Sequence, residues 1–196
     1  MKLLFPSVIH EIWIPDFKQI EGDLIKSAYE ERKKDPVGRR KSNRGGWQSQ
    51  DLSLSNVIYD LIQDKVSSYF LTTRVFKEGT GLSFENAWLN INKKGAYNVS
   101  HSHPDCNLSG VLWIKAPKDC GTIEFISPSV FSRWKEVEYY NKDFQDKIEL
   151  HHSWWLEAVP GKILIFSSSL EHCVEPSESN KDRISVSFNI NLNSSS

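Results

Sequence analysis

Four side chains in the second half of the chain have the chemistry to hold a metal ion and an acidic molecule. His101 and His103 stand two residues apart, and His172 precedes Arg183 by eleven residues. Imidazole is a good ligand for iron, and a catalytic iron site usually takes three protein ligands on one face. The planar guanidinium of an arginine matches a carboxylate in a bidentate geometry. These residue types and spacings predict one divalent metal beside one bound carboxylate.

Asp105 continues the alternation of His101 and His103, so an extended chain points all three side chains the same way. They cannot all bind one ion, because residues four apart on a strand are separated by roughly 13 Å and metal bonds are about 2 Å long. Two pairings remain, His101 with His103 or His103 with Asp105. The first pairing gives an all-histidine site and the second a site of two histidines and one carboxylate. In both cases His172 supplies the distant ligand.

The segment that begins at Arg183 has the pattern of a strand with one polar and one apolar face. Successive side chains of a strand point to opposite faces, so one set would be buried while the other lines a cavity. The apolar set is Ile184, Val186, Phe188 and Ile190, and the polar set is Arg183, Ser185, Ser187, Asn189 and Asn191. Ser185 shares the arginine's face, where its hydroxyl can add a hydrogen bond to the same carboxylate.

Two further strands should line the same cavity. Residues 84–92 place Trp88, Asn90 and Asn92 opposite Ala87, Leu89 and Ile91. Asn90, with Trp113 from a strand expected at 108–116, is predicted to contact the bound carboxylate-bearing molecule.

The order of elements along the chain predicts the architecture that positions these residues. Apolar residues recur at helical spacing over about 17–34 and 54–70, and from about residue 84 the period changes to 2. The strands expected are 3–14, 84–92, 108–116, 121–126, 162–168 and 183–192. This order predicts a mainly β fold, a jelly-roll or cupin-like double-stranded β-helix flanked by N-terminal helices. We expect one domain over 1–196, with a helical part at about 16–70 and a β-helix core at about 84–192.

Composition narrows the function classes. A net charge of −1 gives no global attraction to nucleic acid or to an anionic membrane, so neither is an expected partner. Three cysteines without CxxC spacing argue against a disulfide framework. No stretch reaches the length of a membrane span, and the first residues are too short an apolar run for a signal peptide. We therefore expect a cytoplasmic protein; neither the substrate nor the oligomeric state is predicted.

Seven basic residues lie between Arg32 and Arg44, and the segment over 35–50 adds glycines, among them Gly45-Gly46 before Trp47. Glycines permit hinge motion, so this segment is a candidate lid in which Trp47 covers the cavity.

The ordered set of motifs resembles the 2-oxoglutarate- and Fe(II)-dependent oxygenase superfamily, specifically a group of oxygenases from bacteria and their viruses. The motifs that carry the resemblance are Asn43-Arg44-Gly45-Gly46-Trp47-Gln48-Ser49, Ala87-Trp88-Leu89-Asn90, His101-Ser102-His103-Pro104, Leu108-Ser109-Gly110-Val111, Pro160-Gly161-Lys162-Ile163-Leu164-Ile165-Phe166 with His172, and Arg183-Ile184-Ser185. The resemblance covers nearly the full chain.

The resemblance implies an iron-dependent dioxygenase that hydroxylates a substrate and releases succinate and CO₂ from 2-oxoglutarate. It implies His172 as the distal metal ligand, and Arg183, helped by Ser185, as the anchor of the far carboxylate of 2-oxoglutarate. The His-x-His-Pro motif of this chain resembles that of the group, which has it where the wider superfamily has His-x-Asp. The comparison favours His101 and His103 as the proximal ligands, with Asp105 as the alternative to His101.

Two other functions fit a barrel of this kind. The first is a binding module without turnover, for a carbohydrate, a peptide or a structural metal. The second is a cupin-like dioxygenase that uses three histidines and no co-substrate. Succinate formation distinguishes the leading hypothesis from the binding module, and oxygen consumption independent of 2-oxoglutarate would indicate the cupin-like enzyme.

Overall fold

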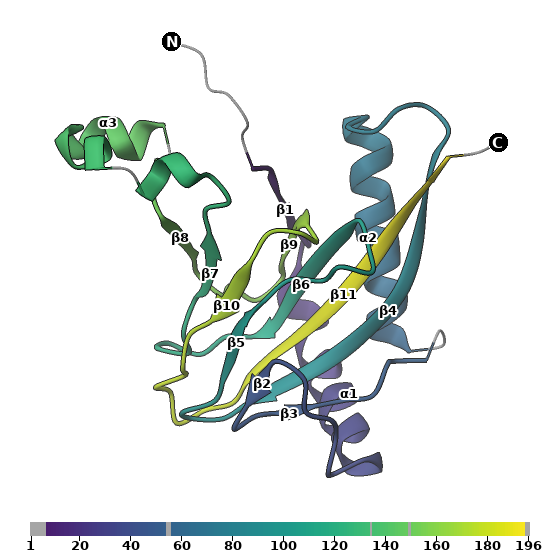
Figure 1. Ribbon diagram of the computed structural model, residues 1–196. Helices are drawn as coiled ribbons and strands as arrows, with labels where there is room; N and C mark the ends of the chain where they lie inside the picture. The colour runs from purple at the N-terminus through teal and green to yellow at the C-terminus, as the bar shows by residue number, and fades with distance from the viewer. Residues whose placement is uncertain (1–6, 54–55, 134, 149, 195–196) are drawn as a thin grey trace.

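Two antiparallel β-sheets face each other in the computed structural model, which describes residues 7–53, 56–133, 135–148 and 150–194 (Figure 1). The larger sheet contains, in spatial order, β1 (Ile9–Trp13), β9 (Lys162–Ser167), β6 (Leu108–Lys115), β11 (Arg183–Ser194), β4 (Thr80–Asn92) and β3 (Trp47–Gln48). The smaller sheet contains β2 (Asn43–Arg44), β5 (Tyr97–His101), β10 (His172–Val174), β7 (Ile123–Ile126) and β8 (Ser153–Leu156). This is the mainly β, double-stranded β-helix architecture expected from the sequence.

The helices of the N-terminal part of the chain cover the outer face of the larger sheet (Figure 1). They are the 3-10 helix η1 (Phe17–Gln19), α1 (Glu21–Lys34) and α2 (Val57–Thr73). In α2, Ile58, Ile62 and Val66 recur every four residues and are buried, so one helical stripe packs on the sheet. Among the described residues, no helix combines the length and apolar character needed to cross a membrane.

The chain between β7 and β8, two paired strands of the smaller sheet, forms a helical arm. It consists of η2 (Val130–Arg133), η3 (Lys135–Tyr139) and α3 (Lys142–Lys147). The arm projects away from both sheets (Figure 1), and α3 has no buried residue. It was not predicted from the sequence.

Strand β11 divides two environments, as its alternation predicts. Its apolar residues, such as Ile184 and Val186, are fully buried in the core shared with the helices. Its polar residues face the space between the sheets. There Ser185 pairs in register with Asn90 of β4 and Trp113 of β6, and Arg183 pairs with Asn92. One face of β11 therefore packs in the hydrophobic core, and its other face lines the polar space between the sheets.

The 35–50 segment is more ordered than expected, because it contains β2 and β3. Gly45, with a φ of 72°, forms the corner at which the chain passes from the smaller sheet to the larger one. Trp47 then pairs with Ile91, is 5% exposed, and packs in the core beneath the helices. Its indole N–H donates to the Asp35 carbonyl at 2.8 Å. The prediction that Trp47 covers the cavity as a lid is therefore wrong; its ring stabilises the opposite face of the sheet.

Candidate active site

Three histidines converge between the sheets. His101 ends β5 and His172 begins β10, and the two are opposite each other in the strand register. His103 lies two residues beyond the end of β5, where its backbone N–H donates to the Ser168 carbonyl at 2.9 Å. The ligating nitrogens of the three histidines all lie within 4.8 Å of one another. One ion can therefore contact all three.

Backbone hydrogen bonds orient two of the rings. Nδ1 of His101 lies 2.7 Å from the Val99 carbonyl, and Nδ1 of His172 lies 2.9 Å from the Leu170 carbonyl. A carbonyl accepts only, so each Nδ1 carries the proton and donates it. The lone pair of each ring is then on Nε2, which is the arrangement a metal-binding histidine needs.

Burial keeps the three imidazoles neutral at physiological pH. It is the largest cause that lowers the pKa of His172 to about 3 and that of His103 to about 4, with a smaller effect of nearby His101 on each. The pKa of His101 is also lowered by burial. Metal binding requires the unprotonated ring, so the cluster is prepared to bind without first losing protons.

The lowered pKa of His172 predicts that the metal-free protein loses stability in mild acid. A histidine whose folded-state pKa lies below its usual 6.5 stabilises the fold fully above pH 6.5, and this contribution is lost as the pH falls toward the folded value. Between pH 6.5 and pH 5 we expect a loss of about 2 kcal/mol from this residue. Urea unfolding of the metal-free protein and of His172→Gln checks this, because the variant should lose less over the same interval. Equal losses in both proteins would contradict the prediction.

Asp105, the alternative to His101, lies apart from this cluster. Its side chain is exposed in the turn after His103, and it is not among the residues whose ligating atoms converge. The geometry therefore brings together the all-histidine set and leaves the carboxylate outside it.

Arg183 lines the same cavity and is 2% exposed. One guanidinium nitrogen, Nη1, donates to the Cys120 carbonyl. The other, Nη2, is buried and has no hydrogen-bond partner among the described residues, and no carboxylate there forms an ion pair with this arginine. A buried charged donor without a partner is costly, so the site is suited to an incoming anion.

The remaining predicted contacts lie in the same cavity as Arg183. Ser185, Trp113 and Asn90 all line the cavity, and each is at least nine-tenths buried. Ser42 and Asn98, joined by a 3.1 Å hydrogen bond, also line the cavity and were not predicted from the sequence. Ser42 precedes the two-residue strand β2, and Asn98 lies on β5, a strand that was not predicted, so no pattern in the sequence indicated either residue.

The residues present fit one Fe(II) ion and one 2-oxoglutarate molecule. Three neutral imidazoles leave the remaining coordination positions of an iron ion open for other ligands. The orphaned Nη2 of Arg183 and the hydroxyl of Ser185 offer charge-assisted hydrogen bonds to a carboxylate in the same cavity.

The model of the family described as "Putative 2OG-Fe(II) oxygenase" matches residues 86–189, which is more than half of the chain. The chain belongs to this family. It is therefore a 2-oxoglutarate/Fe(II) oxygenase family enzyme, and Fe(II) and 2-oxoglutarate are the metal and co-substrate that the family implies.

Solved structures share the fold over almost the full chain at low sequence identity. A prolyl-4-hydroxylase from Pseudomonas putida has a TM-score of 0.65 and 14% identity, with 94% of this chain and 92% of that chain covered. A viral collagen prolyl hydroxylase from Paramecium Bursaria Chlorella virus-1 has a TM-score of 0.59 and 17% identity, with coverages of 93% and 94%. The carbocyclase SnoK from nogalamycin biosynthesis has a TM-score of 0.67 and 10% identity, with coverages of 94% and 79%. A search of curated proteins found no match.

Proposed function

We propose that this protein is a 2-oxoglutarate-dependent Fe(II) dioxygenase that hydroxylates a substrate and releases succinate and CO₂. The observation that carries the proposal is the convergence of three neutral imidazoles in one cavity with the unpartnered guanidinium nitrogen of Arg183. The prolyl hydroxylases among the similar structures support hydroxylation as the outcome.

In this proposal each residue has a defined task. His101 and His172 would bind Fe(II) through Nε2 and His103 would supply the third imidazole, while Arg183 with Ser185 would bind the far carboxylate of 2-oxoglutarate. Trp113, which is 3% exposed, forms an apolar wall beside the co-substrate and excludes water from it.

With Fe(II) and 2-oxoglutarate bound, the site would use O₂ as the oxidant: one oxygen atom enters succinate as 2-oxoglutarate loses CO₂, and the other enters the substrate as its new hydroxyl. The protein positions the metal and the co-substrate and keeps water out of the cavity. The Nδ1 hydrogen bonds of His101 and His172 to backbone carbonyls fix the ring planes, and a fixed metal position requires no reorganisation during the reaction. The buried charge of Arg183 sets the direction in which 2-oxoglutarate enters.

Succinate formation tests this proposal. The protein should convert 2-oxoglutarate to succinate with Fe(II) and oxygen, slowly alone and faster with a true substrate, and should not do so when Zn(II) replaces Fe(II). A protein that binds Fe(II) and 2-oxoglutarate but releases no succinate with any substrate of a broad panel would instead be a binding module.

A further inference from the structure

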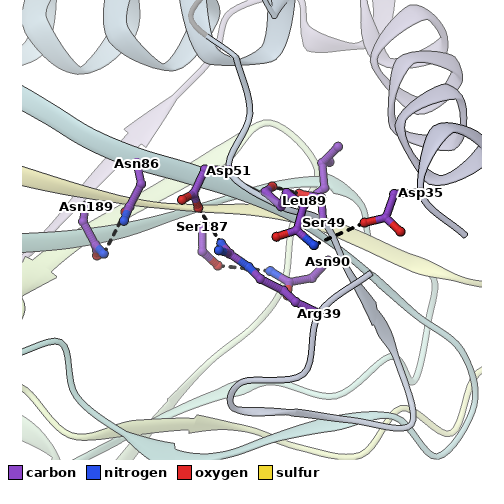
Figure 2. A network of polar contacts seen from close by, with 10 residues as sticks. Asp35, Arg39, Ser49, Asp51, Asn86, Leu89, Asn90, Ser187 and Asn189 are labelled. Atoms are coloured by element: carbon purple, nitrogen blue, oxygen red, sulfur yellow. Dashed lines mark hydrogen bonds and ion pairs between the residues drawn. The ribbon is translucent and has the colours of Figure 1, made fainter. Parts of the chain in front are cut away.

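The inner face of the larger sheet continues past the histidines as a patch of uncharged polar side chains. Hydrogen bonds join three strands there: Ser109 donates to Oδ1 of Asn189 at 2.9 Å, and Nδ2 of Asn189 donates to Oδ1 of Asn86 at 3.0 Å. Nδ2 of Asn90 donates to the Ser187 hydroxyl at 3.2 Å (Figure 2). This patch offers directional hydrogen bonds and no net charge.

Arg39 covers part of this patch at the edge of the cavity. Its guanidinium carbon lies 5.8 Å from the ring centroid of Trp88, and that ring lies 5.8 Å from the ring of His103. Trp88 lines the cavity together with the histidines. Figure 2 shows the Arg39 side chain extending past Asn90 toward Asp51. Arg39 therefore lies beside Trp88, a wall residue of the cavity that holds the histidines.

The charge of Arg39 is already neutralised. Its Nη2 donates to Oδ1 of Asp51 at 2.5 Å, whereas Arg183 has no such counter-ion among the described residues. An anionic substrate would have to displace Asp51 from Arg39. The two arginines are thus suited to different ligands, Arg183 to a carboxylate and Arg39 to a neutral acceptor.

Two buried atoms at this end of the cavity have no partner among the described residues: Nε of Arg39, a donor, and Oδ1 of Asn90, an acceptor. The amide nitrogen of Asn90 is engaged by Ser187, so the free atom of Asn90 repels a carboxylate and requires a donor. A ligand that satisfies both atoms must carry an acceptor for Nε of Arg39 and a donor for Oδ1 of Asn90. A hydroxyl combines both on a single oxygen, but an amide separates them onto its C=O and N–H.

We propose that the prime substrate presents an uncharged amide group, such as a peptide bond or a carboxamide, to Arg39 and Asn90 beside the ring of Trp88. The carbonyl accepts from Nε of Arg39, and the amide N–H donates to Oδ1 of Asn90. This inference rests on the proposed function and adds the substrate class to it. Asn90 then belongs to the substrate side of the cavity, whereas the sequence analysis predicted it to contact the co-substrate.

The arginine Nε–H signal in a ¹⁵N nuclear magnetic resonance spectrum provides the test. The protein is loaded with Zn(II), which has no redox chemistry, and with 2-oxoglutarate. Three probes are titrated separately: N-acetylglycine N′-methylamide as the neutral amide, acetate as the anion and glycerol as the polyol. We expect the amide to shift the Arg39 Nε–H signal in a saturable manner and the other two probes to leave it in place.

Three variants make the result specific. Arg39→Lys keeps the charge but lacks Nε, so the dissociation constant of the amide should rise at least about tenfold, the effect of one hydrogen bond from a charged donor. Arg40→Gln changes the neighbouring exposed arginine and should leave amide binding unchanged. Asp51→Asn removes the counter-ion, so acetate should now shift the Arg39 signal. The backbone spectrum of each variant verifies that it is folded.

A saturable shift by the amide alone supports the inference. A shift by acetate in the unmodified protein, a shift by glycerol alone, or no shift by any probe up to its solubility limit would overturn it. If Zn(II) and 2-oxoglutarate themselves fail to bind, the proposed function fails instead, so the two failures are distinguishable.

Discussion

Alanine in place of His172 is expected to weaken Fe(II) binding by at least about 100-fold and to abolish succinate formation. His172 is 5% exposed and provides one of the three imidazoles that converge. Loss of a direct ligand should exceed the 10- to 100-fold effect typical of residues that merely support a metal ligand. Anaerobic titration with Fe(II) measures the dissociation constant. The matched control is His152→Ala, which removes an exposed histidine and should change nothing. Fe(II) binding within a few-fold of the unmodified protein in His172→Ala would contradict the assignment.

The same titration distinguishes the two proximal pairings. His101→Ala should lose Fe(II) affinity as His172→Ala does, because these two residues are opposite each other in the register of β5 and β10. Asp105→Ala should keep it, because its carboxylate is exposed outside the cluster. The reverse result, loss in Asp105→Ala and retention in His101→Ala, would restore the two-histidine, one-carboxylate site.

Arg183→Ala is expected to raise the dissociation constant of 2-oxoglutarate by about 100- to 1,000-fold, or about 3 to 4 kcal/mol. The reason is that the buried carboxylate of the co-substrate would lose the one lysine or arginine among the described residues that line the cavity. Arg183→Lys keeps a charge but not the planar fork, so its affinity should lie between the two. Fe(II) affinity without 2-oxoglutarate should stay within a few-fold in both variants.

Calorimetric titration of 2-oxoglutarate into the Fe(II)-loaded protein without oxygen gives these constants. Circular dichroism checks that each variant is folded. Equal 2-oxoglutarate affinity in Arg183→Ala and in the unmodified protein would mean that another residue holds the carboxylate.

The long strands could be predicted from the sequence because each carries its own evidence. Nine consecutive alternating residues from Arg183 show one polar and one apolar face, and the structure confirms both faces of β11. The spacing of His101 and His103 and the position of His172 made these three candidate ligands, but His101 and Asp105 stayed alternatives until the family resemblance favoured His101. These features depend on local periodicity, which a single chain displays directly.

The remaining features depend on pairing between distant segments. β2, β3 and β10 are two or three residues long, too short to show a period, and they form only because longer strands lie beside them. The lid prediction for Trp47 failed for the same reason: pairing of β3 with β4 decides which face of the sheet the indole occupies. Asp105 could be set apart from His101 only once the turn after β5 was known.

The central claim is that one cavity holds Fe(II) and 2-oxoglutarate together. Its most direct test is to titrate 2-oxoglutarate into the protein under anaerobic conditions, first without metal and then with Fe(II). Linked binding at one site requires that each ligand strengthen the other, so we expect one molecule bound per chain and a dissociation constant at least about tenfold lower with Fe(II). Binding of 2-oxoglutarate with the same affinity in both titrations, or no binding in either, would contradict the account.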